Sequence, residues 1–281
     1  SMRAALLLTL ILTACGGGDP TPDPSQSAAM QPAARPKKIV HESMWTAQPD
    51  ITACCNHSAI VITDQGPRIY TNSDGTNGGD LWLWENGVQR TVLHITDPRD
   101  TYIRTLGVTR GPDGRYFALL FTGDGYPTNG GYSPSFADSA DGVNWTWRGP
   151  VSPYGRNQSS GQALTVDEAG HMRAWLDIGG EIREMHSADG LHWTDAGAIG
   201  FAGLYVSAAR GVRGTMLAFA DQYPATKITT VWQCHGGPWA VLEKSSVIKN
   251  GDKGSALTYA GGLLHAFSNG RHWTAAEPGC L

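Results

Sequence analysis

Acidic or amide side chains follow apolar stretches of this 281-residue chain at near-regular intervals. They are Asp74, Asp124, Asp177, Asp221 and Asn269. Two carboxylates held about 5–9 Å apart can act as acid and as base or nucleophile on a glycosidic bond. We expect Asp177 and Asp221 to be the catalytic pair, with Asp124 or Glu181 as substitutes. A structural role is the alternative, because Asp and Asn commonly end strands.

These side chains need a repeated scaffold, and the spacing of turn glycines supplies one. Glycines between two short apolar strands recur with spacings of 44 to 56 residues, at Gly66, Gly114, Gly170, Gly214 and Gly262. Units of this length with about four strands are typical of β-propeller blades. We therefore predict an all-β, five-bladed β-propeller over residues 39–281. Pairing of the N- and C-terminal strands would close the ring, with residues 39–45 completing the last blade. A β-sandwich would explain the strands but not the period.

The composition limits the function classes. The 36 glycines, 10 tryptophans and 16% charged residues fit short strands and tight turns. The net charge of −4 argues against nucleic acid as a partner. No phosphate-binding glycine loop precedes a helix, so we expect no cofactor. The cluster Cys54-Cys55-Asn56-His57 lacks companions at zinc-like spacing, so we expect no metal site.

A motif ties the chain to known propellers. Residues 187–193, Ser-Ala-Asp-Gly-Leu-His-Trp, have a near twin at residues 139–145 and a weaker echo at residues 268–273. We expect each to form a tight turn sealed by a buried Trp. The pattern Ser-x-Asp-Gly-x-x-Trp resembles the Asp-box of sialidase-like propellers. It also resembles turns of five-bladed glycosidases such as arabinanases, xylosidases and fructosidases, to which residues 111–117 are similar as well. The resemblance implies that Asp141 and Asp189 are structural and lie away from the active face.

The face opposite these turns is the expected ligand site. It collects the starts of the innermost strands and the loops that leave the second strands, where ligands usually bind. Tyr126 and Tyr132, in a long loop of the second unit, suit stacking on sugar rings, and Glu181 lies beside Asp177. The expected ligand-binding residues at the strand starts are His57, Arg104, Gln162, Tyr205 and Lys253.

The catalytic set of neither resembling family carries over. The five-bladed glycosidases have an Asp at the start of the first inner strand, where this chain has Asn56-His57-Ser58. Sialidases gather three arginines and a Tyr-Glu pair, and only Arg104 can be placed here.

The N-terminus predicts export. Residues 1–15 combine Arg3 with an apolar stretch, and Leu12-Thr13-Ala14-Cys15 resembles a bacterial lipobox, so Cys15 would be lipidated. Gly16 rather than Asp after it implies transfer to the outer membrane; an ordinary secretory signal is the alternative. Residues 16–38 are rich in Gly, Pro and Ser and predict a flexible tether.

Four further cysteines suit an exported protein. We expect a Cys234–Cys280 disulfide, because both residues would lie on the Asp-Gly-Trp face of adjacent blades. The adjacent Cys54 and Cys55 would form a strained vicinal bridge or find distant partners.

The sequence thus predicts an outer-membrane lipoprotein, monomeric and held to the membrane by its lipid anchor alone. Its propeller would be a glycoside hydrolase-like domain for a glycan or other small polar ligand. The alternative is a non-catalytic propeller that binds a glycan or a surface protein.

Overall fold

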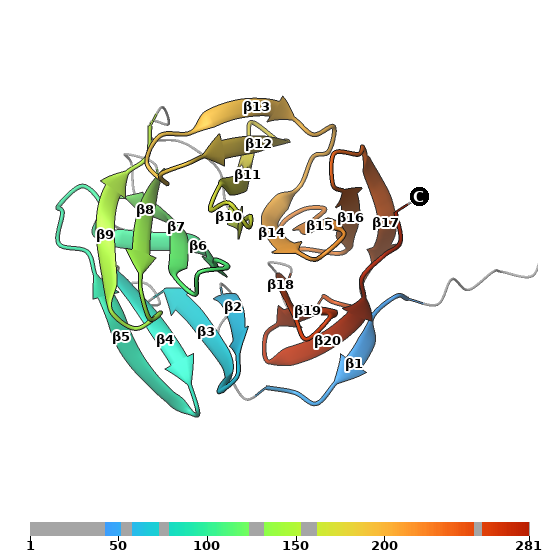
Figure 1. The fold of residues 1–281 in the computed structure, drawn as a ribbon, viewed down its shortest axis with the longest axis horizontal. Helices are drawn as coiled ribbons and strands as arrows, with labels where there is room; N and C mark the ends of the chain where they lie inside the picture. The colour runs from blue at the N-terminus through green and yellow to red at the C-terminus, as the bar shows by residue number, and fades with distance from the viewer. Residues whose placement is uncertain are drawn as a thin grey trace, which may run out of the picture. The chain divides into compact units, whose positions relative to one another are not determined.

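Five antiparallel four-stranded sheets surround a central axis in the computed structural model (Figure 1). The structure describes residues 43–51, 58–72, 79–123, 132–152, 162–249 and 255–280. These ranges contain twenty strands and no helix, so no helix among them is long and apolar enough to cross a membrane. The predicted all-β, five-bladed propeller is confirmed.

Blades 1 to 4 follow one another along the chain, each running from its innermost to its outermost strand, and blade 5 takes its outermost strand, β1, from the N-terminal side. Blade 1 consists of β2 (Ser58–Thr63), β3 (Gly66–Asn72), β4 (Asp80–Glu85) and β5 (Val88–His94). Blade 2 consists of β6 (Tyr102–Arg110), β7 (Tyr116–Gly123), β8 (Ser133–Ser139) and β9 (Trp145–Pro150). Blade 3 consists of β10 (Gln162–Val166), β11 (Met172–Ile178), β12 (Glu181–Ser187) and β13 (Thr194–Ala198). Blade 4 consists of β14 (Leu204–Arg210), β15 (Gly214–Ala220), β16 (Ile228–Cys234) and β17 (Trp239–Ser245). Blade 5 consists of β18 (Ala256–Ala260), β19 (Leu263–Ser268), β20 (Arg271–Ala276) and β1 (Thr46–Gln48).

The core lies between the blades. Five buried apolar clusters fill the five interfaces between neighbouring sheets, from blades 1 and 2 round to blades 5 and 1. The second strands are therefore covered on both faces, and β7 and β15 are buried along their whole length. This is why they read as continuous apolar runs, whereas the outermost β5 and β13 are mostly exposed.

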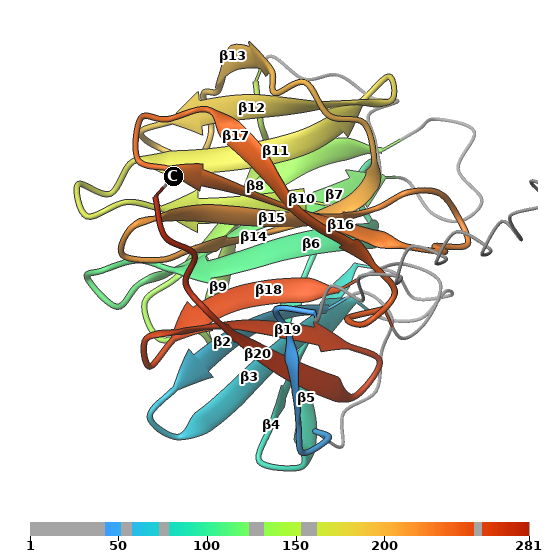
Figure 2. The ribbon, with the colours of Figure 1, turned by 90° about the vertical axis from the view of Figure 1, so that its right-hand side faces the viewer.

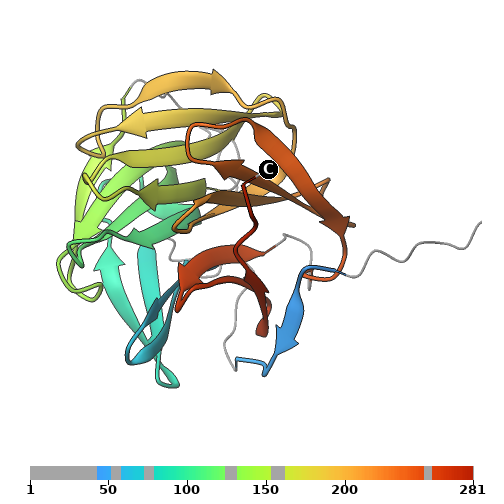
Figure 3. The same ribbon diagram turned by 45° about the vertical axis from the view of Figure 1, so that its right-hand side comes forward.

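The ring closes by pairing of the two ends of the propeller. Strand β1 lies antiparallel to β20, with Thr46 opposite Thr274 and Gln48 opposite His272 (Figures 2 and 3). The expected closure is thus present, but the closing strand begins after residues 39–45. Trp45 is buried in the cluster between blades 4 and 5, so it anchors the strand instead of belonging to it.

A disulfide fastens the C-terminal tail to blade 4. Cys234, which ends β16, is bonded to Cys280 with an S–S distance of 2.06 Å. Nearby, the backbone N–H of Arg213 donates to a carboxylate oxygen of Glu277. Blades 4 and 5 are therefore linked both by the disulfide and by hydrogen bonds from the tail.

The two Ser-x-Asp-Gly-x-x-Trp turns have the same hydrogen-bond pattern. Asp141 accepts from the N–H groups of Val143 and Asn144 at 2.8 Å, and Asp189 accepts likewise from Leu191 and His192 at 2.8 Å. The preceding Ser accepts from the turn Gly, and the Trp indole donates to the carbonyl of that Gly. These hydrogen bonds hold the pKa of both carboxyl groups well below the usual range.

The weaker echo of this motif, residues 268–273, is a different turn. Asn269 and Gly270 form a two-residue connection with φ of 47° and 82° between β19 and β20. It joins the second and third strands of its blade, whereas the two matching motifs join the third and fourth strands. It therefore lies at the other face of the propeller.

Candidate functional site

The antiparallel register brings the predicted site residues to one face. The starts of the inner strands lie beside the ends of the second strands, as in the pairs Tyr102–Gly123, Gln162–Leu176 and Leu204–Ala220. We call this the upper face. The Asp-Gly-Trp turns lie on the opposite, lower face, as the sequence predicts.

Asp177 is a buried carboxyl group on the upper face. It follows Trp175 and Leu176 in β11, and only 5% of its surface is exposed. Burial between the blades raises its pKa, although the backbone N–H of Gly180 donates to the carboxylate and opposes that shift. Asp177 therefore holds a proton more readily than an exposed Asp, as a general acid requires.

Asp221 has a different environment. It is exposed after β15, and one carboxylate oxygen accepts from the N–H groups of Thr226 at 2.9 Å and Lys227 at 3.0 Å. The other oxygen accepts from the Thr226 hydroxyl. Desolvation raises the pKa of Asp221, but these hydrogen bonds together outweigh it and lower the pKa to about 2. Asp221 is therefore an ionised group that closes its own loop. It differs from Asp177, which is buried and has a raised pKa.

Glu181 lies across a two-residue turn from Asp177. Gly179 and Gly180, both with positive φ, form this turn, and Ile178 pairs with Glu181. The Glu181 side chain is largely exposed and lies 3.6 Å from the guanidinium of Arg183. It therefore faces solvent at the rim of the upper face.

Arg104 and Tyr132 form a cation–π pair in blade 2. The guanidinium carbon of Arg104 lies 4.9 Å from the ring centroid of Tyr132. The same ring packs against Tyr102 at 5.9 Å and Phe121 at 6.1 Å, and only 7% of the Tyr132 surface is exposed. Tyr132 therefore supports exposed Arg104, and its own ring has little surface free for stacking on a ligand.

Asp100 is a site residue that the sequence reasoning missed. It lies just before β6 on the upper face, only 3% exposed, and accepts from the hydroxyl of Thr122 at 2.9 Å. The sequence analysis places Arg104 at the start of this inner strand, but β6 begins at Tyr102 and shifts register between Ile103 and Thr105. The signal in the sequence was that Asp100 comes just before Tyr102 and Ile103, which belong to β6.

Tyr205 lies at the start of β14 and contacts a second missed residue, Tyr223. Their rings meet edge to face with centroids 6.1 Å apart. Tyr205 has a φ of 54°, which is uncommon for a residue with a side chain. These two rings are the aromatic feature of the upper face in blade 4.

Several predicted positions lie outside the described residues. They are Asp74, Asp124, His57, Lys253, Tyr126, Cys15, Cys54 and Cys55. Gln162 begins β10, but its side chain is likewise outside the description. Within the part of the chain that the structure describes, no group of three His, Cys, Asp or Glu side chains is placed to hold a metal ion.

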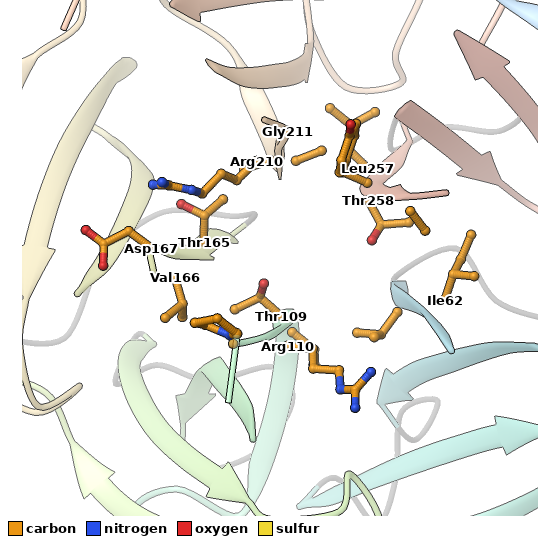
Figure 4. A pocket seen from close by; sticks show the side chains of 18 of the residues that line it. Ile62, Thr109, Arg110, Thr165, Val166, Asp167, Arg210, Gly211, Leu257 and Thr258 are labelled. Carbon is orange, nitrogen blue, oxygen red and sulfur yellow. The ribbon is translucent and has the colours of Figure 1, made fainter. Parts of the chain in front are cut away.

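The lower mouth of the central channel holds a cavity of about 540 Å³ (Figure 4). Its wall consists of the ends of the five inner strands and the turns that follow them. Three of its charged groups have local partners: Asp167 accepts from the N–H groups of Ala169 and His171, and Arg210 pairs with Glu168. The cavity lies at the face opposite Asp177.

Comparisons with known proteins support the fold. No protein-family model matches the sequence, and no curated protein matches it. A candidate glycoside hydrolase from Parabacteroides distasonis superposes with a TM-score of 0.56 at 11% identity, over 82% of this chain and 88% of that one. An exo-β-1,3-galactanase from Clostridium thermocellum gives 0.57 at 10% identity, over 82% and 62%. A family 117 glycoside hydrolase from Zobellia galactanivorans gives 0.55 at 11% identity, over 72% and 75%. At these identities the likeness shows a shared propeller fold.

Proposed function

We propose that this chain is a carbohydrate-active propeller that hydrolyses glycosidic bonds on its upper face. The observation that carries the proposal is Asp177, a carboxyl group buried between blades with a raised pKa. The glycoside hydrolases that share the fold support a carbohydrate substrate.

Asp177 acts as the general acid in this proposal. A carboxyl group that stays protonated can give its proton to the glycosidic oxygen as the bond to the anomeric carbon breaks. The reaction also needs an ionised carboxylate that activates water or attacks the anomeric carbon. We assign that role to no described carboxylate. Asp100 is buried on the same face of the neighbouring blade, but its partner Thr122 lies on the side of blade 2 that faces blade 1, whereas Asp177 lies on the side of blade 3 that faces blade 4. Asp221 is not used, because its oxygens are bound to its own loop.

The test is hydrolysis of aryl glycosides and soluble polysaccharides by the wild-type protein and single variants. Asp177→Asn should lower kcat by about 10²–10⁴-fold, the usual contribution of general acid–base catalysis. Asp64→Asn, an exposed carboxylate at the lower face, is the matched control and should keep full turnover. Full activity of Asp177→Asn would reject the proposal.

A non-catalytic glycan-binding propeller is the second candidate. It is favoured by the hydrogen bonds that tie Asp221 to its own loop, because Asp221 is the other carboxylate that the sequence suggested for catalysis. Glycan binding without turnover by the wild-type protein would establish this candidate instead.

We also propose that the protein is an exported lipoprotein, anchored in the outer membrane through Cys15 and acting as a monomer. The lipobox-like sequence before Cys15 and the polar residues 16–38 support this. Radiolabelled palmitate should enter the full chain but not a Cys15→Ala variant. Labelling of that variant would contradict the assignment.

A further inference from the structure

The loop of residues 221–227, which joins β15 to β16, is held at three points. The Asp221 carboxylate accepts from Thr226 and Lys227 across the loop, and the Asp221 N–H donates to the Lys227 carbonyl at 3.2 Å. Ala225, between these ends, is buried in the cluster between blades 4 and 5. The loop therefore has a fixed shape.

This fixed loop presents an aromatic ring to solvent. Tyr223 is 57% exposed, and it is the one aromatic among the exposed large apolar side chains of the described residues. Single exposed apolar side chains are common on protein surfaces, but the fixed loop holds this ring in one position and keeps its exposed face available to a ligand.

Tyr205 supports the ring from beneath. It meets Tyr223 edge to face, and it packs in turn against the cluster between blades 4 and 5. Its positive φ coincides with a register shift in β14 between Leu204 and Ser207. Rare backbone conformations of this kind gather at ligand-binding positions, where the surrounding structure maintains them.

The pair lies on the blade next to the proposed catalytic acid, on the side of blade 4 that faces blade 5. Strand β14, which begins with Leu204 and Tyr205, packs against β11, which carries Asp177 at its end. Both positions belong to the upper face, on adjacent blades. A chain molecule bound at Asp177 therefore reaches Tyr223 by extending over the upper edge of blade 4.

We propose that Tyr223, supported by Tyr205, is a stacking platform for a sugar ring of the bound glycan, one or more units away from the linkage at Asp177. The C–H groups on one face of a pyranose form an apolar surface that packs on an aromatic ring. The exposed side chains of Gln222 and Lys227 border the platform and supply hydrogen-bond donors for sugar hydroxyls. The inference rests on the proposed function, since it names a subsite of the same binding face.

The experiment measures glycan affinity in the full chain carrying Asp177→Asn, which prevents turnover. Soluble mannan, β-1,3-galactan and arabinan are the probes, in native affinity gels. With the probe that binds, adding Tyr223→Ala should weaken binding by about tenfold, as expected for loss of one aromatic contact. Tyr223→Phe should keep the affinity, because it keeps the ring. Tyr259→Ala, at the lower-face cavity, is the matched control and should also keep it.

The outcomes separate this inference from the proposed function. Unchanged affinity in Tyr223→Ala, with hydrolysis by the wild-type protein intact, would overturn the platform and leave the function standing. Equal loss in Tyr223→Phe and Tyr223→Ala would replace stacking by a hydroxyl contact and also overturn it. Neither binding nor hydrolysis of any probe by the wild-type protein would overturn both. Thermal melting of each variant shows that the propeller is folded.

Discussion

Asp221 and Thr226 are joined by two hydrogen bonds, one from the Thr226 backbone N–H at 2.9 Å and one from its hydroxyl. The Asp221 carboxylate thus supplies an acceptor for the backbone N–H groups of Thr226 and Lys227 beyond the end of β15. Its position in the repeat matches that of Asp177, which instead lies buried between blades with a raised pKa. Equivalent positions of the repeat therefore carry a structural carboxylate in blade 4 and a candidate acid in blade 3.

Replacing Asp221 should affect stability before chemistry. Asp221→Ala removes the hydrogen bonds that close the 221–227 loop, so the free energy of unfolding should fall by about 1–2 kcal/mol. KM should rise because the loop carries Tyr223, while kcat stays within a few-fold of the wild type. Urea denaturation and steady-state kinetics measure these quantities. A loss of kcat as large as that of Asp177→Asn, at unchanged stability, would return Asp221 to the catalytic pair.

The same carboxylate has a predictable acid response. The pKa of Asp221 is about 2 in the folded chain and about 3.9 in an unfolded one. The lower folded value means that its stabilising contribution is complete above about pH 4 and is lost as the pH falls toward 2. The difference in unfolding free energy between wild type and Asp221→Asn should therefore shrink over this window. A difference that stays constant down to pH 2 would show that the charged form has no special role.

The glycines of two lower-face turns allow a test of how the blades pack. Gly190 and Gly170 have nearly equal φ, 80° and 83°, so alanine should cost each about 1 kcal/mol of left-handed strain. A Cβ at Gly190 would lie 2.3 Å from the ring of Phe136 in blade 2, whereas one at Gly170 would meet nothing within 4 Å. Gly190→Ala should therefore lose a further 1–3 kcal/mol or so from overpacking. Chemical denaturation of both variants measures the free energy of unfolding. Equal losses of this free energy would mean that the Phe136 ring moves aside without cost.

The fold was predictable because its signals are periodic, and the site was not because its signals are local. Turn glycines and apolar runs repeat in every blade, so blade number and the two faces follow from the sequence alone. The environment of a single carboxylate depends on what packs around it: Asp177 is enclosed by neighbouring blades, and Asp221 is caught by Thr226. Asp100 was missed because β6 begins at Tyr102, ahead of a register shift between Ile103 and Thr105. Tyr223 was missed because the sequence does not show that its loop is fixed by Asp221 and Ala225.

A histidine pair beside the closing strand predicts weaker closure in mild acid. His265 Nδ1 and His272 Nε2 are 2.9 Å apart with stacked rings, and His272 lies opposite Gln48 of β1. Burial lowers the pKa of both; a hydrogen bond to the Ala260 carbonyl partly offsets this for His265, and charge repulsion from His265 adds to it for His272. A lowered folded pKa means that the unfolded chain binds protons more readily, so stability is complete above about pH 6.5 and falls below it.

The measurement is the unfolding free energy at about pH 7.5 and pH 5 for the wild type and for His272→Gln. The wild type should lose stability between these values, and the variant should lose less because one titrating partner is gone. Exposed Arg271, which lies 3.7 Å from Asp50, is the nearest permanent charge in this strand and is common to both proteins. If the unfolding free energies of the wild type and of His272→Gln changed equally with pH, the histidine pair would have no role in the acid response.

The disulfide should contribute more to stability than the hydrogen bonds of the C-terminal tail, because it closes a long stretch of chain. Cys234 and Cys280 are 46 residues apart, and a cross-link of this span reduces the entropy of the unfolded chain by an amount worth about 4 kcal/mol. A Cys234→Ser, Cys280→Ser double variant should lose most of that stability. Glu277→Gln is the informative comparison: it leaves the cross-link but weakens the tail's hydrogen bonds to Arg213, and should cost only about 1 kcal/mol. Non-reducing urea denaturation separates the two contributions. If the Cys double variant cost no more than Glu277→Gln, the cross-link would contribute no more to stability than the tail's hydrogen bonds.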